Sequence, residues 1–262
     1  MLPLALLLTT LLPSAKAKLD LTALITKIDP TTSTCATPGE CRTAAQAAPL
    51  LNASFTHRGI HCRQEAACLT SLVILETDHL KYLHNVSPGR AGQGTANMQM
   101  CRFNAEYAAS EPELKRCFPD VVPAGMEPSE GQCRRLLKCI LERDVFAFDT
   151  PAWFWEKKCA DEGVKSRLRD GGVEACAGYL KSCVGVDGND AGRASWNRKA
   201  YDAFGVADAK ACVPLGEDAA VARPAVPPMG PAASSAAAPP AAPPAAPPAA
   251  PPAQDHMDEC RD

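Results

Sequence analysis

Aromatic residues are scarce in this chain of 262 residues, because seven Phe, four Tyr and three Trp make up only 5% of it. An excess of positive charge is missing too. The formal net charge is −3, and the stretch from Lys18 to Leu215 holds 24 Lys and Arg against 24 Asp and Glu. Nucleic-acid binding needs a basic surface and, for single strands, aromatic platforms on which bases stack. The two shortages predict that nucleic acid is not a partner.

Long hydrophobic runs are also missing. The apolar stretch within residues 1–17 is shorter than the roughly 20 residues of a membrane-spanning helix, and it ends in the small-x-small sequence Ala15-Lys16-Ala17. This pattern predicts a signal peptide over 1–17 and a secreted protein, extracellular or in a cell wall, that is not a membrane protein. The sequons at Asn52 and Asn85 are then candidate glycosylation sites.

The end of the chain differs in composition from the middle. Half of the prolines, 12 of 24, lie between Pro224 and Pro252, where most other residues are Ala. Such a sequence cannot bury a core and favours an extended polyproline path. We therefore expect a signal peptide, an N-terminal segment, one folded domain and a disordered tail, over residues 1–17, 18–34, 35–214 and 215–262.

Cysteine is abundant, but the Cys-x-x-Cys spacing typical of zinc sites does not occur. Of the 13 cysteines, Cys260 lies beyond the proline-rich stretch, where it could be free, capped or bonded to another chain. The other twelve predict up to six disulfides, whose pairing the sequence leaves open, and no metal or other cofactor. They are Cys35, Cys41, Cys62, Cys68, Cys101, Cys117, Cys133, Cys139, Cys159, Cys176, Cys183 and Cys212.

The hydrophobic pattern of the middle of the chain is mainly helical. Thr150-Pro151 is typical of a helix start, with Thr as the N-cap and Pro in the first turn. Turn-forming residues between Asn85 and Ala96 favour a short β-hairpin. The expected class is therefore mainly α (α+β), a disulfide-rich helical domain with one small hairpin. The expected helices cover 42–57, 62–83, 97–109, 129–143, 150–160, 172–183 and 190–204.

One face of the expected helix 62–83 is apolar except for Glu76. Its members are Leu69, Leu72, Val73, Glu76, Leu80 and Leu83. A carboxyl group among apolar side chains loses solvation and favours the protonated form, as a general acid in glycosidic cleavage requires. The alternative interpretation is a Glu at the helix end that forms an ion pair with an Arg.

A glycine-rich segment follows Glu76 after a short loop. Its glycines allow turns and close approach to a ligand, whereas a phosphate-binding loop would need a following Lys-Ser or Lys-Thr, which is absent. Amides at the start of the next helix can bond sugar hydroxyls or N-acetyl groups. The candidate substrate-binding residues are Gly89, Gly92, Gln93, Gly94, Asn97, Gln99, Asn104 and Tyr107.

This arrangement resembles the lysozyme-like superfamily. Glu76-Thr77, a short turn and a glycine-rich segment that closes on Met98-Gln99 are most similar to lytic transglycosylases and goose-type lysozymes. The stretch 146–155, and the part from Cys183 through Arg193 to Gly205, resemble plant-type chitinases of that superfamily. The resemblance covers roughly residues 60–205. It implies a lysozyme-like fold, with Glu76 as catalytic acid and Gln99 lining the sugar groove.

Two departures bear on catalysis. Asp78-His79 stands where this pattern has a glycine, and the short span from Glu76 to Gly89 lacks the insertion that holds a second carboxylate in plant-type chitinases. Catalysis would then rest on Glu76, with Asp78 as possible helper and Glu106 and Asp149 as weaker options.

The leading expectation is a secreted enzyme that cleaves β-linked amino-sugar polymers, of the peptidoglycan or chitin type, with Glu76 as acid. The neutral domain slightly favours chitin-like material. The rival is a non-catalytic secreted glycan-binding or wall-associated protein of the same fold.

Two further groups of residues are interpreted as structural. They are the aromatics at 153–155, Trp196 and Tyr201, expected in the core, and the histidines at 57, 61, 79 and 84, expected on the surface or in loops. No Gly-x-Ser-x-Gly motif supports an esterase.

Overall fold

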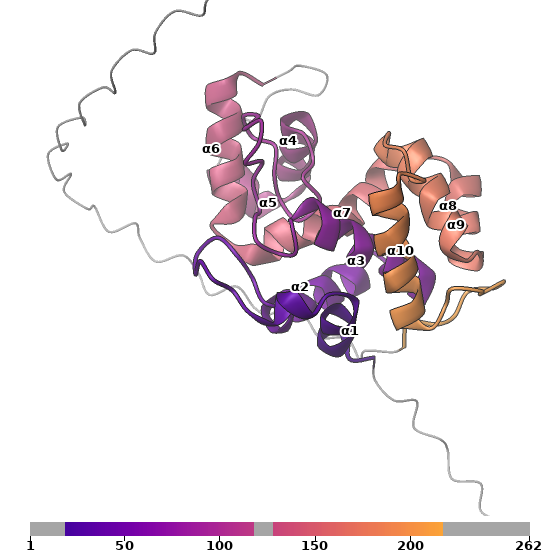
Figure 1. The fold of residues 1–262 in the computed structure, drawn as a ribbon. Coiled ribbons are helices and arrows are strands. Elements are labelled where there is room, and N and C mark those ends of the chain that lie inside the picture. The colour runs from indigo at the N-terminus through magenta and orange to yellow at the C-terminus, as the bar shows by residue number, and fades with distance from the viewer. Residues whose placement is uncertain (1–18, 118–127, 217–262) are drawn as a thin grey trace, which may run out of the picture. The chain divides into compact units, whose positions relative to one another are not determined.

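The computed structural model describes residues 19–117 and 128–216, which are mainly helical (Figure 1). The predicted helical class is therefore confirmed. In the described part of the chain the hairpin region holds only the isolated antiparallel bridges His84–Gly94 and Gly94–Gln99, with no named strand. The elements are α1 (Leu21–Ile28), η1 (Pro30–Ser33), α2 (Ala44–His57), α3 (Arg63–Glu76), α4 (Cys101–Ser110), α5 (Pro112–Cys117), α6 (Glu130–Leu141), α7 (Asp144–Lys158), α8 (Glu162–Asp170), α9 (Val173–Tyr179), η2 (Leu180–Val184) and α10 (Ala191–Phe204).

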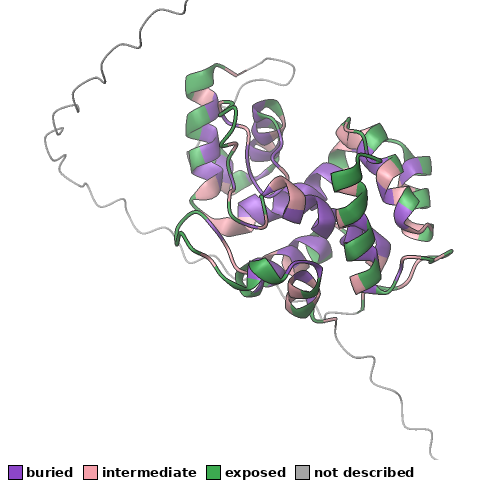
Figure 2. Cartoon of the chain, viewed as in Figure 1, coloured by how far each residue is buried: buried purple, intermediate pink, exposed green. Residues whose placement is uncertain are grey.

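Helix α7 lies between two hydrophobic clusters. Phe146, Trp153 and Phe154 pack with α4 and α6, whereas Phe148 and Trp155 pack into the larger cluster with α2, α3, α9 and α10. A helix that buries side chains on all sides belongs in the interior, and Figure 2 shows α7 and α3 mostly buried. The three adjacent aromatics at 153–155 are at most 6% exposed, which confirms them as core residues.

Pro151 lies inside α7 and not at a helix start, so the boundary predicted from Thr150-Pro151 is wrong. Proline has no N–H to bond the carbonyl four residues before it. Here the Ala147 carbonyl accepts instead from the Ala96 N–H at 3.1 Å and from the Thr150 hydroxyl at 2.9 Å. Pro151 thus leaves the Ala147 carbonyl of a buried helix without its usual N–H donor, and Ala96 of the glycine-rich loop donates to it.

The chain forms disulfides, as the cysteine count predicted, and most of them join distant parts of the chain. The pairs are Cys35–Cys41, Cys62–Cys212, Cys68–Cys176, Cys101–Cys133 and Cys159–Cys183. Cys139 is disulfide-bonded as well. The side chain of Cys117, the whole of Cys260 and the segments 1–18 and 217–262 lie outside the described residues.

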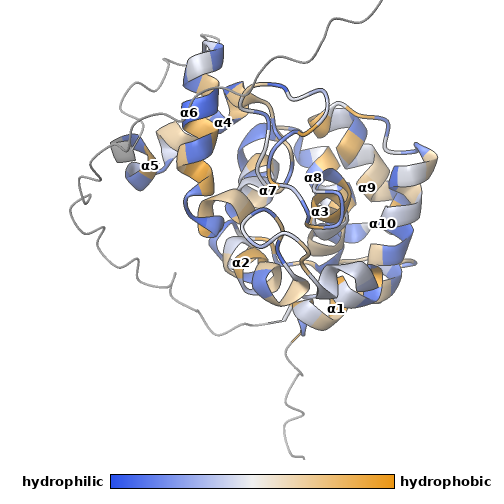
Figure 3. Cartoon of the chain, turned by 60° about the vertical axis from the view of Figure 1, so that its left-hand side comes forward, coloured by the Kyte–Doolittle hydropathy of each residue, from blue (hydrophilic) through white to orange (hydrophobic). Residues whose placement is uncertain are grey.

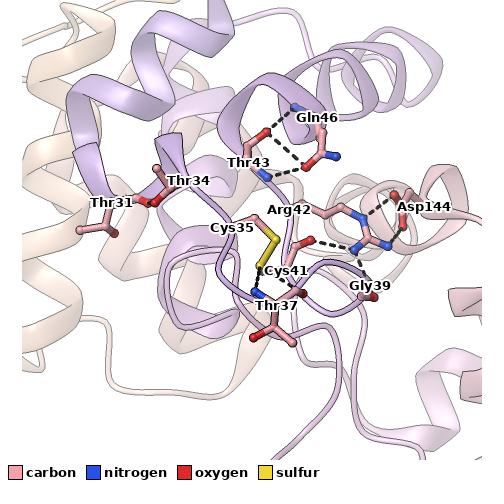
Figure 4. The surroundings of a disulfide bond; sticks show 10 residues. All are labelled: Thr31, Thr34, Cys35, Thr37, Gly39, Cys41, Arg42, Thr43, Gln46 and Asp144. Atoms are coloured by element: carbon pink, nitrogen blue, oxygen red, sulfur yellow. Dashed lines mark hydrogen bonds and ion pairs between the residues drawn. A yellow bond between two sulfur atoms is a disulfide. The ribbon is translucent and has the colours of Figure 1, made fainter.

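Helix α1 is part of the folded domain. Leu21, Ile25 and Ile28 are buried in the larger cluster, where α1 packs against α2 and α10. The domain therefore includes residues that the sequence analysis assigned to a separate N-terminal segment. After α1, the Cys35–Cys41 loop leads to Arg42, whose guanidinium binds both oxygens of Asp144 at 2.5 and 2.6 Å (Figure 4). This contact ties the N-terminal part to the start of α7.

Helix α3 ends at Glu76, seven residues before the predicted boundary at 83. Asp78 takes a left-handed conformation (φ 47°), and the His79 N–H donates to the Ile74 carbonyl at 2.8 Å, which closes a Schellman-type cap. His79 (φ 67°) and Leu80 (φ 65°) are left-handed as well. Three consecutive non-glycine residues in this region are strained. This turn replaces the last two helical turns that periodicity predicted.

We expect Asp78→Gly to raise the free energy of unfolding by about 1 kcal/mol, because glycine adopts the left-handed C-cap conformation without the Cβ penalty. The Asp78 ion pair with Lys81 at 3.0 Å is more than half exposed and contributes little. Chemical denaturation of the two proteins measures the gain. Asp78→Ala is the control, since it removes the same carboxylate and keeps the strain. Equal stability of the Gly and Ala variants would contradict the strain argument.

Candidate functional site

Glu76 is the last residue of α3, and its side chain forms an ion pair with α10. The Glu76 Oε1 atom lies 2.8 Å from Nη2 of Arg193, and the two side chains are 21% and 20% exposed. The other guanidinium nitrogen, Nη1 of Arg193, is buried and has no hydrogen-bond partner in the part of the chain described. The structure therefore matches the alternative interpretation of this residue: a Glu at a helix end paired with an Arg. The Glu76 carboxyl group is thus already engaged by the Arg193 guanidinium.

The turn after Glu76 is held to α1 and α10 by His79. Its Nδ1 atom contacts the buried Asp29 carboxylate, and its ring packs edge-on against Trp196 at 5.1 Å between centroids. Burial opposes the charge of Asp29, but hydrogen bonds from Thr31 and His79 lower the pKa of Asp29 below its ordinary value. His79 thus lies in a loop, within the predicted surface or loop placement, and its contacts anchor the strained turn.

Asp78 meets one condition for a helper role, because the helix has ended before it. Its carboxylate, however, pairs with Lys81 and His79 and is about half exposed. Neither Glu106, which binds Lys158 at 2.6 Å, nor Asp149, described below, has a contact with Glu76 in the residues that the structure describes. None of the three candidate helper carboxylates therefore has a contact with Glu76 within that part of the chain.

The amides of the glycine-rich segment bond one another. Gln99 Nε2 donates to Asn104 Oδ1 at 2.7 Å, and Asn104 Nδ2 donates to the Gly92 carbonyl at 2.9 Å. Asn97 Nδ2 donates to Gln99 Oε1 at 3.2 Å. Gln99 and Asn104 are at most 5% exposed. Because buried polar groups need such partners, this network holds the loop in shape. It does not present Gln99 or Asn104 to a ligand.

Gly92 and Gly94 are required by close packing. A Cβ on Gly92, where φ is +69°, would lie 2.7 Å from the Cys133 Cβ of α6, and one on Gly94 would lie 2.6 Å from the Leu83 carbonyl oxygen and 2.8 Å from Leu137 of α6. Both glycines therefore allow the loop to approach neighbouring parts of the protein closely. Gly89 is exposed, and it is its backbone conformation, with φ of +77°, that favours glycine at this position.

A groove of about 530 Å³ lies between the glycine-rich loop and α6. It brings together three of the predicted binding residues, Gly89, Gly92 and Gln93, and the sequon residue Asn85. Asn85 orders the loop itself, since its Nδ2 donates to Gln93 at 2.9 Å and its Oδ1 accepts from the Gly89 N–H at 2.7 Å. The α6 side of the groove is lined by Arg134, Leu137, Lys138, Leu141 and Glu142, which the sequence analysis did not select.

A second cluster of charged groups is buried around Arg58. Its guanidinium binds Asp149 through Nε, at 3.2 and 3.1 Å from the two oxygens, and Glu111 at 2.7 Å. Burial opposes its charge, but the hydrogen bonds and charges of these carboxylates raise the pKa of Arg58 above its ordinary value. Tyr107 donates to Asp149 at 3.1 Å, and burial together with these carboxylates raises the pKa of Tyr107 well above 10.0. Tyr107 thus lies in this cluster and is fully buried, away from the groove lining.

The side chains of this cluster are as close together as the ligands of a metal site, but their oxygens already accept hydrogen bonds from other residues. His57, Glu111 and Asp149 place ligand atoms within 4.8 Å of one another, beside a cavity of about 210 Å³. The Asp149 oxygens, however, already accept from Arg58, Ser54 and Tyr107. A guanidinium stands where a cation would bind, so the donor set fits an ion-pair network better than a metal ion. A second group, His61 with Cys62 and Cys212, offers no thiolates because the two cysteines are bonded to each other.

Part of the chain is similar to a known fungal protein. The bifunctional dioxygenase (DOX)-epoxy alcohol synthase (EAS) of Fusarium oxysporum (strain Fo5176) is 33% identical over 164 residues, which are 62% of this chain and 12% of that protein. The chain thus spans about an eighth of the relative's length. No protein family matches the sequence. No solved structure matches the chain either. In the described ranges, no helix is long and apolar enough to cross a membrane.

Proposed function

We propose that this chain is a secreted, non-catalytic glycan-binding protein, which holds amino-sugar polymers in the groove between the glycine-rich loop and α6. The observation that carries the proposal is the Glu76–Arg193 ion pair, since it engages the carboxylate on which cleavage would depend. The groove supplies a place for sugar elsewhere, with Gly89 and Gln93 on one wall. Secretion is supported by the disulfides, which form and persist in oxidising compartments.

The resemblance to the lysozyme-like superfamily supports the class of ligand. The features that carry this resemblance are Glu76, at the end of a buried helix, and the glycine-rich loop that follows after a short turn. The relative's two named activities give no competing proposal, because this chain covers only 12% of that protein.

Cleavage by Glu76 is a second candidate, favoured by one observation. Only Oε1 of Glu76 is bonded in the described structure, and the side chain keeps 21% of its surface exposed. A substrate that separated Glu76 from Arg193 would restore the general acid that the resemblance implies.

The test measures binding and turnover together. We expect the wild type and Glu76→Gln to bind chitin hexasaccharide and soluble peptidoglycan fragments equally, with no new reducing ends or anhydro-sugars from either. Leu141→Trp should weaken binding by about tenfold, since an indole would fill part of the groove. Val86→Trp is the matched control, because Val86 is 57% exposed and does not line the groove.

Two results would overturn the proposal. Turnover by the wild type that Glu76→Gln abolishes would establish the enzyme instead. Binding that Leu141→Trp leaves unchanged would place the ligand outside this groove.

A further inference from the structure

The walls of the groove are more basic than the chain as a whole. Arg90, Arg134 and Lys138 line it together with a single acid, Glu142. From Lys18 to Leu215, by contrast, Lys and Arg equal Asp and Glu in number. The neutral average of the domain, which slightly favoured chitin-like material, therefore conceals a local positive charge.

The geometry of α6 produces this charge. Arg134, Leu137, Lys138, Leu141 and Glu142 are spaced by three and four residues, so they share one face of the helix. Figure 3 shows α6 with hydrophilic and hydrophobic residues on different sides. Like charges four residues apart, such as Arg134 and Lys138, destabilise a helix. An anion bound between them would relieve that repulsion.

The cations are available to a ligand. Arg90 and Lys138 are exposed and form no ion pair with any residue that the structure describes. Arg134 has a contact with Glu130, but at 3.8 Å with both side chains mostly exposed it is weak. The Arg90 N–H is fixed by Asn85 Oδ1, which holds the backbone of this residue at the groove.

The groove offers fewer strong contacts to a neutral sugar than to a charged one. Among the described residues that line it, the only ring is the imidazole of His84, and the apolar side chains are Leu137 and Leu141. Without a Trp, Tyr or Phe platform in that part of the chain, charge-assisted hydrogen bonds from Arg and Lys are the strongest interactions that these walls can form.

Building on the proposed glycan-binding function, we propose that the groove selects anionic polysaccharides, whose carboxylate or sulfate groups bind between Arg90 on the loop and Lys138 on α6. The sugar rings lie against Leu137 and Leu141. Salt weakens this binding, because exposed charges are screened.

The experiment compares chitin oligosaccharides of one length in neutral, carboxymethylated and sulfated forms, by calorimetry on the full chain at two salt concentrations. We expect the two anionic forms to bind about tenfold tighter than the neutral form at low salt. Arg90→Gln/Lys138→Gln should remove this preference, so that the two anionic forms bind no tighter than the neutral form. The control, Lys181→Gln/Lys210→Gln, removes the same charge from exposed positions outside the groove and should keep the preference.

The outcomes separate the two proposals. Equal affinity for all three forms supports glycan binding and overturns anion selection. An equal loss of the preference for anionic forms in both double variants also overturns anion selection. Tight binding of only the carboxymethylated or only the sulfated form supports anion selection and identifies the group. No binding of any form overturns both proposals.

Discussion

Asp149→Ala is expected to lower the free energy of unfolding by about 3–5 kcal/mol, because it removes one partner of a buried ion pair and leaves the other without compensation. Asp149 is 3% exposed and accepts hydrogen bonds from Ser54, Arg58 and Tyr107. After the substitution the Arg58 side chain, itself 8% exposed, keeps Glu111 and a long contact with Glu156 at 3.4 Å as its acidic partners among the described residues. Equilibrium unfolding in guanidinium chloride, with the disulfides intact, measures the loss.

The matched control is Asp144→Ala. Asp144 also binds an Arg through both oxygens, but the Arg42 and Asp144 side chains are 16% and 30% exposed. Water can solvate the remaining guanidinium there, so we expect a loss of about 1 kcal/mol or less. Similar losses in the two variants would contradict the view that burial sets the cost of the Arg58 cluster.

The helical class was predictable because helix periodicity is local. Each amphipathic stretch carries its own pattern, and seven expected helices correspond to α2, α3, α4, α6, α7, α9 and α10. Helices α1, α5 and α8 were missed. For α1 and α8, Asp20 and Asp161 were readable N-caps, because each side chain accepts from a backbone N–H of its helix. Weighing caps as well as periodicity would have found both.

Boundaries failed where distant residues decide them. Thr150-Pro151 has the local form of a helix start, but the Ala147 carbonyl is satisfied by Ala96, some fifty residues earlier. The end of α3 depends on a strained turn that Asp29 holds through His79, fifty residues apart. Local sequence cannot show such partners.

The candidate site was predictable in part for the same reason. The apolar face around Glu76 correctly indicated partial burial, but its partner Arg193 lies 117 residues away. Gln99 and Asn104 have the residue types of a sugar site, yet the fold pairs them with each other. The α6 wall of the groove was missed because its cations look like an ordinary solvated helix face until the loop lies beside them.

Removal of the Cys68–Cys176 disulfide should have the other large effect on stability. This bond closes a loop of 108 residues, and both cysteines are fully buried between α3 and α9. A cross-link lowers the conformational entropy of the unfolded chain by an amount that grows with the logarithm of the loop length. Cys68→Ala/Cys176→Ala should therefore lower the free energy of unfolding by about 4–5 kcal/mol. Denaturant unfolding of the double variant measures the loss.

Cys35→Ala/Cys41→Ala is the control, since this bond closes only six residues and the same relation gives about 2 kcal/mol. Each double variant loses one disulfide and gains two alanines, so the difference between them reports the longer loop together with the deeper burial of Cys68 and Cys176. An equal loss in the free energy of unfolding in the two double variants would contradict the view that the long-range disulfides stabilise the protein through chain entropy. Their stabilisation would then have to come from contacts within the folded protein, such as the packing of Cys68 and Cys176 in the larger hydrophobic cluster.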